Sequence, residues 1–469
     1  MRKARKNYFI YLMMLLIFGG LIYTAIAGGE RFLHLSSIKP ATAGDDAFTM
    51  FKTILLDNLE HPFSILLIQI IVVLIAVRIF ASAFRYIGQP GVIGEIVAGI
   101  VLGPSLLGSL YPEFFGFLFQ PDSLTNLELI SQLGLVLFMF VIGMEVDFGV
   151  LKNKINETLV ISHAGILVPF FLGMLASYWV YEEYASQQTA FLPFALFIGI
   201  SMSITAFPVL ARIIKDRNLS KTSYGITALT CAAADDATAW YLLAIVIAIS
   251  TSTNLLMSVL MFIPILLYIA FMILVIKPFL KKIGYKVNNR DLDMRITTIV
   301  LVVLLASSLF TEVLGIHALF GAFLAGVMMP SSKDSELKER IAPRLEYVSL
   351  LVLLPLFFAL TGLRTQINLL EPQHWLICLV IIAVAVVGKF VGSTVASKLM
   401  GGSWRDSLAI GALMNTRGLM ELIVLNIGYE LGILSPLLFT MFVIMALVTT
   451  FMTGPSLHLI DKIFSKKKL

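Results

Sequence analysis

Two adjacent carboxylates, Asp235 and Asp236, lie near the centre of a long apolar stretch and are flanked by alanines. In a lipid bilayer, an ionisable side chain at mid-depth costs at least about 2.5 to 3.5 kcal/mol and persists only with a partner or a water-filled cavity. A structural role does not explain two like charges side by side. Consecutive positions lie about 100° apart around a helix, so one carboxylate can face a counter-charge while the other faces a cavity. The pair indicates an ion- and proton-binding site that titrates as a coupled unit.

One lysine matches this pair in charge. Lys389 lies in the sequence VGKFVG, deep inside another apolar stretch. A lysine can extend its ammonium group toward the membrane surface, but Lys389 is near the limit of that reach. Pairing with Asp235 or Asp236 accounts better for its depth, so we interpret Lys389 as their counter-charge.

Two apolar stretches contain residues that interrupt helices. The sequence SMSITAFP ends at Pro208, which removes a backbone donor, and its hydroxyl groups include those of Ser203 and Thr205. Helix ends at mid-membrane offer dipole ends and free carbonyls to an ion, so Ser203 and Thr205 are expected to supply oxygen ligands at the break. The sequence NTRGLME holds Arg417 and Glu421, whose four-residue spacing favours a local salt bridge over an ion ligand.

The composition predicts that a membrane surrounds these residues. Of 469 residues, 58% are apolar and 13% are charged, and the mean hydropathy is +0.93. These values exclude a soluble enzyme, which would expose large apolar patches, and the continuous apolar runs exclude a β-barrel. The net charge of +5 does not indicate nucleic-acid binding. No cofactor is expected and no metal beyond a transported alkali cation, and Cys231 and Cys378 are interpreted as free core residues.

Apolar runs bounded by charges, glycine or proline predict an all-α polytopic membrane protein with 13 or 14 transmembrane helices. The candidate segments lie near residues 8–27, 61–85, 91–108, 128–147, 157–180, 189–213, 222–249, 254–277, 293–311, 316–330, 345–363, 373–396, 403–428 and 434–460. If the first segment starts inside, 27 of the 34 lysines and arginines fall in inside loops and four fall outside. This distribution predicts a cytoplasmic C-terminus.

The first segment has two interpretations. Residues 1–30 combine a basic start, an apolar stretch and the sequence AIA, which is typical of a signal peptide as well as of a transmembrane helix. Residues 48–56 have the apolar spacing of a short interfacial helix. Only residues 461–469 follow the last predicted helix, as a basic cytoplasmic tail, so control by a long nucleotide-binding domain is not expected.

Matching motifs indicate an internal repeat. The pattern G-x-x-x-A-G begins at Gly94 and recurs at Gly321, and a Leu-Phe pair precedes Gly143 and Gly362 at the same spacing. An odd number of crossings separates the two copies, so they insert in opposite orientations, which is the signature of alternating-access transporters. We predict a first inverted six-helix repeat at 61–249, a linker helix at 254–277 and a second repeat at 293–460.

Four stretches give the chain a clear resemblance to the monovalent cation:proton antiporter family, which includes bacterial sodium/proton antiporters, potassium efflux systems and plant cation/proton exchangers. The stretches are residues 89–105 (QPGVIGEIVAGIVLGPS), the Asp235-Asp236 pair, residues 315–320 (GIHALF) and residues 417–428 (RGLMELIVLNIG). The resemblance implies two crossing broken helices, a homodimer and a multi-pass protein of the plasma or inner membrane. It also implies that Asp236 is the ion- and proton-binding carboxylate and that Lys389 pairs with Asp235.

The mechanism expected from these residues is competition between a proton and Na⁺ or K⁺ for Asp236. The sequence leaves the choice between these cations open. A cation channel and an intramembrane aspartyl protease are the alternatives, but no ring of filter ligands is evident and adjacent carboxylates do not form a protease dyad. His163 and His317 are expected to be dispensable, because the carboxylate pair already supplies a proton carrier.

Overall fold

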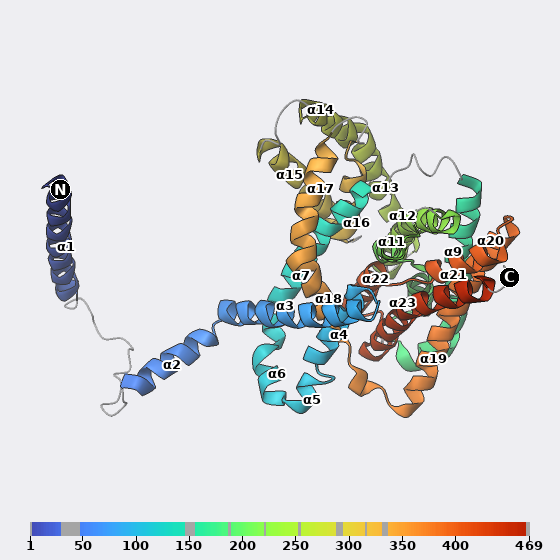
Figure 1. Cartoon of the computed structure of the whole chain (residues 1–469), viewed down its shortest axis with the longest axis horizontal. Helices are drawn as coiled ribbons and strands as arrows, with labels where there is room; N and C mark the ends of the chain where they lie inside the picture. The colour runs from blue at the N-terminus through green and yellow to red at the C-terminus, as the bar shows by residue number, and fades with distance from the viewer. Residues whose placement is uncertain are drawn as a thin grey trace. The chain divides into compact units, whose positions relative to one another are not determined.

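The computed structural model describes residues 2–29, 47–145, 155–185, 189–219, 222–251, 255–287, 294–314, 317–330 and 336–465. These residues are almost entirely helical, as predicted (Figure 1). The chain divides into two compact units, Met1–His61 and Pro62–Leu469. The first unit contains α1 (Arg2–Gly29) and α2 (Ala47–Leu59). Both a signal peptide and a transmembrane segment form a helix, so α1 is compatible with either interpretation, and α2 includes the predicted interfacial helix.

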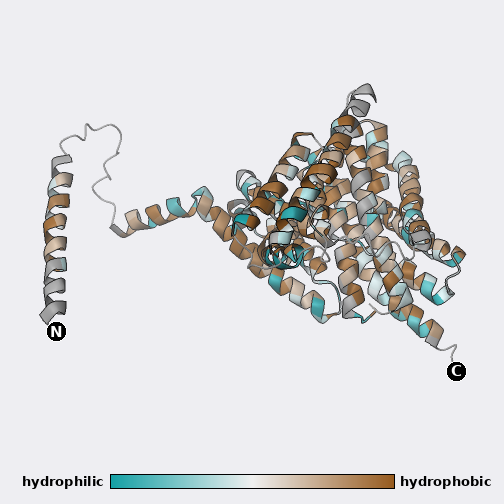
Figure 2. Cartoon of the chain, turned by 90° about the horizontal axis from the view of Figure 1, so that it is seen from above, coloured by the Kyte–Doolittle hydropathy of each residue, from teal (hydrophilic) through white to brown (hydrophobic). Residues whose placement is uncertain are grey.

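The second unit is built from apolar helices (Figure 2). Nine helices among the described residues are long and apolar enough to cross a membrane. On α3 (Pro62–Tyr86), Ile71 and Ile75 are exposed while Val73 and Val77 are buried. Apolar side chains on both faces of a helix are expected where one face packs in the protein and the other contacts lipid. The protein is therefore a multi-pass membrane protein.

The helices of the second unit form two groups by their contacts. The first, called the panel group, contains α3, α4 (Gly91–Leu102), α7 (Pro121–Glu145), α15 (Met294–Val313), α16 (Ala318–Val327), α17 (Leu337–Val348) and α18 (Leu354–Arg364). The second, called the crossing group, contains α9 (Ile155–Tyr184), α10 (Phe191–Ser203), α11 (Phe207–Asp216), α12 (Ser223–Thr251), α19 (Pro372–Val386), α20 (Gly392–Leu399), α21 (Trp404–Met414), α22 (Leu419–Glu430) and α23 (Pro436–Ser465).

The remaining elements are shorter helices and turns, together with α13 and α14, which cover one of the nine apolar spans, Ile263–Tyr285. They are α5 (Leu107–Leu110), α6 (Pro112–Leu118), α13 (Leu255–Phe271), α14 (Lys277–Val287), a 3-10 turn at Ile367–Leu369, and π-helical turns at Met272–Ile276, Ser349–Leu353 and Val387–Val391. The last π-helical turn joins α19 to α20 and contains Lys389. A π-helical turn inserts one extra residue into a helix and is frequently found at functional sites.

Both predicted helix breaks are present. The segment 189–213 is split into α10 and α11 around residues 204–206, and the segment 403–428 is split into α21 and α22 around residues 415–418. The second break ends at Gly418, whose φ of 154° disfavours any side chain. The two breaks touch, because the amide of Ala206 donates to the carbonyl of Thr416 at 3.1 Å. These are the two crossing broken helices expected from the family resemblance.

The repeated glycines occupy matching positions in the panel group. A Cβ on Gly99 of α4 would clash with α18 at the carbonyl of Ala359, and a Cβ on Gly362 would clash with α4. In the same way, Gly326 of α16 and Gly143 of α7 each lie against the backbone of the other helix. Each half of the chain thus supplies one helix to each crossing, which is consistent with the predicted repeat. The opposite orientation of the two repeats and their boundaries stay predictions.

Candidate ion-binding site

A buried ion pair lies beside the touching helix breaks. The Nζ atom of Lys389 lies 2.8 Å from Oδ2 of Asp235, and neither side chain has exposed surface. Lys389 also donates to the carbonyl of Ser203, the last residue of α10, at 2.5 Å. The structure therefore brings together Lys389, Asp235 and the first helix break. Isolated charges are very costly at such burial, so the pair depends on its mutual contact and on these hydrogen bonds.

Backbone geometry positions Lys389. Its π-helical turn packs against α9, where Gly388 approaches Pro169 so closely that a Cβ at residue 388 would lie 2.7 Å from the Pro169 Cα. A proline inside a helix frees a carbonyl and bends the chain, and a glycine opposite it allows the two backbones to come together. The close approach of this π-helical turn to α9 directs the ammonium group of Lys389 toward the helix breaks.

Two hydroxyl groups complete the surroundings of Asp235. Ser162 of α9 donates to Oδ1 at 2.5 Å, and Thr205 in the first break donates to Oδ2 at 2.9 Å. Both oxygens of Asp235 are thus occupied by donors of the protein. Asp236 follows Asp235 on α12, about 100° further around the helix axis, and its side chain lies outside the described residues.

The two residues expected as oxygen ligands differ in their contacts. The Ser203 hydroxyl donates to carbonyls of Gly199 and Ile166, so it caps its own helix and ties it to α9. Thr205 contacts Asp235 directly, and its hydroxyl lies 3.2 Å from the carbonyl of Met414 at the second break. The threonine therefore links the carboxylate to both broken helices.

Arg417 has a larger role than the sequence indicated. Its guanidinium group donates from Nη1 to the carbonyl of Ser201 at 2.9 Å and from Nη2 to the carbonyl of Met202 at 2.6 Å. Its Nη1 also lies 3.2 Å from Oε2 of Glu421, and both side chains are fully buried. The predicted contact between Arg417 and Glu421 is present, but the arginine mainly caps the end of α10.

Together, Arg417 and Lys389 neutralise one helix end. The last carbonyls of α10, those of Ser201, Met202 and Ser203, all accept from one of these two cations. A helix C-terminus carries about half a negative charge and has no backbone donors for its last carbonyls. Both cations come from the second half of the sequence. The second half thus stabilises the break in the first half.

Sequence reasoning missed three features of the site. Ser162 was not singled out, although it is a hydroxyl on an apolar helix near Gly165 and Pro169. The hydrophobic periodicity of the sequence does not reveal the π-helical turn that contains Lys389, and the glycines next to Lys389 are the only sign of it in the sequence. The carbonyl partners of Arg417 lie more than 200 residues away and require the tertiary structure.

Two broken helices that touch beside a buried ion pair in a multi-pass membrane protein are typical of secondary active transporters. The family described as "Sodium/hydrogen exchanger, transmembrane" matches residues 70–461. The chain belongs to this family of monovalent cation:proton antiporters, which confirms the resemblance found in the sequence.

Individual relatives agree with this assignment. The Na⁺/H⁺ antiporter NhaS4 of Synechocystis is 41% identical over 394 residues, which cover 83% of this chain and 96% of the relative. The K⁺/H⁺ antiporter 1 of Saccharomyces cerevisiae is 33% identical over 414 residues, which cover 86% of this chain and about half (47%) of the relative. Among solved structures, the sodium proton antiporter MjNhaP1 of Methanocaldococcus jannaschii has the same fold, with a TM-score of 0.61 at 16% identity, covering 86% of this chain and 99% of that one.

Proposed function

We propose that this protein exchanges a monovalent cation, Na⁺ or K⁺, for protons by alternating access, and that Asp236 binds both. The observation that carries the proposal is the buried Lys389–Asp235 pair where the two broken helices touch, one residue before Asp236. The names of the relatives support both cations, because the Synechocystis protein is named for Na⁺ and the yeast protein for K⁺.

The charges at the crossing explain why the cargo is monovalent. Lys389 balances Asp235, and Arg417 balances Glu421, so these four groups sum to zero. Asp236 adds one negative charge on α12. A proton or one alkali cation neutralises that charge, whereas the empty site retains it and is costly to move across the apolar barrier. Exchange follows because only a loaded site crosses, and it carries one of the two ligands in each direction.

Asp235 then has a positioning role at the site. Its oxygens are held by Ser162, Thr205 and Lys389, which fix it between α9, the first break and the π-helical turn. A carboxylate with its acceptors occupied by protein donors is a poor ligand for a second cation. Thr205 and the backbone carbonyls at the breaks are the oxygen groups that we propose as further ligands for the cation bound to Asp236.

The test is a ΔpH-dequenching assay in everted vesicles with Li⁺, Na⁺, K⁺ and Rb⁺. We expect wild-type protein to move protons only when a cation is added, and Asp236→Asn to abolish exchange while the protein still inserts. Asp461→Asn, which neutralises an exposed carboxylate, is the matched control and should exchange normally. Exchange retained in Asp236→Asn would mean that the ion site lies elsewhere. A cation current that flows without proton movement would indicate a channel.

We further propose a homodimer in the plasma or inner membrane with a cytoplasmic C-terminus. The excess of lysines and arginines in alternate loops supports the orientation. A protease site appended after residue 469 should be cut in everted vesicles and protected in intact cells. The mass of the purified protein in detergent should be twice that of the 51.7 kDa chain.

A further inference from the structure

A second ion cluster lies at the end of α18, away from the crossing. Arg364 donates from Nη2 to Glu128 of α7 at 2.6 Å, and from Nη1 to Asn426 and Glu430 of α22 at 2.7 and 3.1 Å. Its guanidinium carbon also stands 5.5 Å from the centre of the Tyr429 ring. The side chains of Arg364, Glu128 and Glu430 are 17%, 25% and 31% exposed, so the cluster is largely shielded from solvent.

The cluster joins the two helix groups. Glu128 and Arg364 belong to the panel group, whereas Asn426, Tyr429 and Glu430 belong to α22 of the crossing group. α22 begins at the second helix break and Glu430 is its last residue, so the cluster holds the half-helix at its far end, about 17 Å from the break. Asn426 also donates to the hydroxyl of Thr361 on α18 at 2.9 Å. Any movement of α22 relative to α7 and α18 must stretch these bonds.

A cavity lies directly beside the cluster. It has a volume of about 530 Å³ and is lined by residues that include Gln132, Glu312, His317, Ile427 and Glu430. A second, much smaller space of about 20 Å³, close to the room needed for one water molecule, is lined by Arg364, Glu128 and Asn426. The two spaces share Gln132, His317, Ile427 and Glu430 as lining residues, so little open room remains where Arg364 binds α22.

We propose that Arg364 is a positioning residue for the exchange reaction, which closes a passage from this cavity along α22 by binding α22 to α7 and α18. Opening of the passage separates Arg364 from Glu430 and Asn426. One guanidinium faces two carboxylates here, so separation leaves Glu430 at the cavity wall as a negative charge that attracts cations. The inference rests on the proposed exchange function, because only a transporter needs this passage to open and close.

Cysteine labelling tests the closure without requiring transport. Ile427 is buried and lines both the cavity and the smaller space beside Arg364, so Ile427→Cys reports whether a soluble maleimide reaches this point. The native cysteines, Cys231 and Cys378, are buried and give the background rate. In detergent-solubilised protein, Arg364→Gln should accelerate labelling of residue 427 by at least about tenfold, which corresponds to about 1.4 kcal/mol of lost closure.

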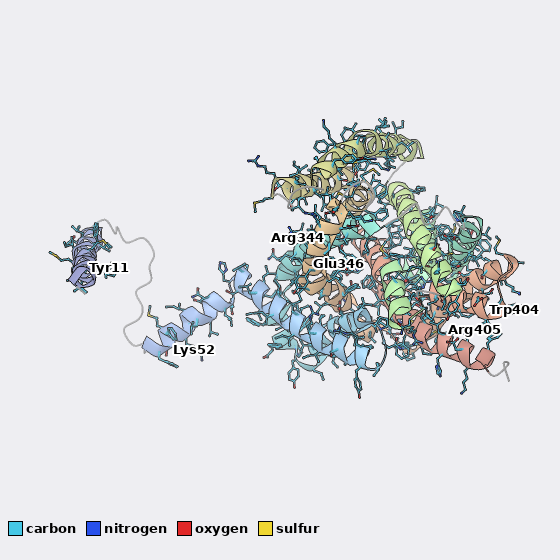
Figure 3. All side chains as sticks on the ribbon, turned by 45° about the horizontal axis from the view of Figure 1, so that its top comes forward. Tyr11, Lys52, Arg344, Glu346, Trp404 and Arg405 are labelled. Carbon is cyan, nitrogen blue, oxygen red and sulfur yellow. The ribbon has the colours of Figure 1, made fainter. Side chains whose placement is uncertain are left out.

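Two controls separate closure from general loosening. Arg405→Gln removes an exposed pair with Asp461 at the start of α21 (Figure 3) and should leave the labelling rate unchanged. Leu438→Cys, a buried position on α23 that lines neither space, should stay unlabelled in the Arg364→Gln background. If Arg364→Gln does not fold, Glu430→Gln replaces it, because it keeps the side-chain shape and removes the charge that pairs with Arg364.

The outcomes distinguish this inference from the proposed function. An unchanged labelling rate at residue 427 in folded Arg364→Gln or Glu430→Gln overturns the closure by Arg364. Equal acceleration at Leu438→Cys also overturns it, because the whole bundle would then have loosened. Exchange that survives Asp236→Asn refutes the proposed ion site instead and leaves the labelling result intact.

Discussion

Replacing Lys389 by alanine should destabilise the protein mainly through the charge that it leaves behind. Asp235 would remain fully buried with two hydroxyl donors, from Ser162 and Thr205, and the carbonyl of Ser203 would lose its ammonium partner. Breaking a buried pair from one side typically costs about 3 to 5 kcal/mol. Because two hydrogen bonds to Asp235 survive, we expect the lower end, about 3 kcal/mol.

A double-mutant cycle measures the part that belongs to the pair. Lys389→Ala, Asp235→Asn and the double variant are unfolded in mixed micelles of increasing sodium dodecyl sulfate, and their free energies of unfolding are compared. The double variant should recover at least about 1 kcal/mol relative to the sum of the single changes, because no buried charge is left unpaired. Lys398→Ala, on neighbouring α20, is the matched control. Its ammonium group contacts the carbonyl of Gly402 and the ring of Trp404 but no buried carboxylate, so its loss should cost about 1 kcal/mol or less.

A coupling energy of zero would refute this reasoning, since it would mean that Lys389 does not interact with Asp235 in the membrane protein. The same variants also address the ion stoichiometry. If Asp235, contrary to the positioning role proposed above, acts as a second proton carrier that Lys389 releases during the cycle, the double variant should convert electrogenic exchange into electroneutral exchange. Voltage-sensitive dye measurements in proteoliposomes distinguish the two.

Three further expectations follow from particular contacts. Gly362→Ala should lower stability by about 1 to 3 kcal/mol, because the added Cβ meets the backbone of α4. Gly116→Ala, with open space around it, should not, and equal thermal midpoints for the two variants would contradict the close packing of α18 against α4. Arg417→Lys should cost about 1.5 to 3 kcal/mol in the same unfolding assay, because an ammonium group does not reproduce the two parallel bonds to the end of α10, and a wild-type value would count against that cap. His163→Ala should exchange at the wild-type rate, since the exposed His163 ring bonds only its own helix. His317→Asn should retain exchange, because asparagine tolerates the positive φ of residue 317 at the start of α16. Loss of transport in either well-expressed variant would implicate a histidine relay.

The helix breaks were predictable because local chemistry determines them. A proline and several hydroxyl residues mark the first break, and a polar sequence with glycine marks the second, and neither signal depends on distant residues. The meeting of Lys389 and Asp235 was also predictable, since buried charges need partners and few candidates exist inside the apolar stretches. The repeat could be recognised because close helix crossings require glycine at fixed positions.

Other features depend on contacts between distant segments. Arg364 was counted only as one of the few positive charges in outside loops, and its carboxylate partners lie 66 and 236 residues away in the sequence. The capping of α10 by Arg417 also depends on residues that are distant in the sequence. The apolar pattern of residues 387–391 predicts an ordinary α-helix. A π-helical turn differs from it in backbone hydrogen bonding and not in which residues are apolar, so the pattern does not distinguish the two.

The reciprocal glycine crossings have a consequence for how the chain matures. α4 is completed by α18, and α7 is completed by α16, so each of these two crossings needs one helix from each half of the chain. During synthesis, α4 and α7 enter the membrane about 250 and about 170 residues before their respective partners exist, and the glycine faces that meet those partners are then covered by lipid or by the insertion machinery. Formation of these two crossings is therefore an intramolecular assembly of two halves. Two fragments divided in the linker region would be expected to reconstitute the protein only when produced together in the same membrane.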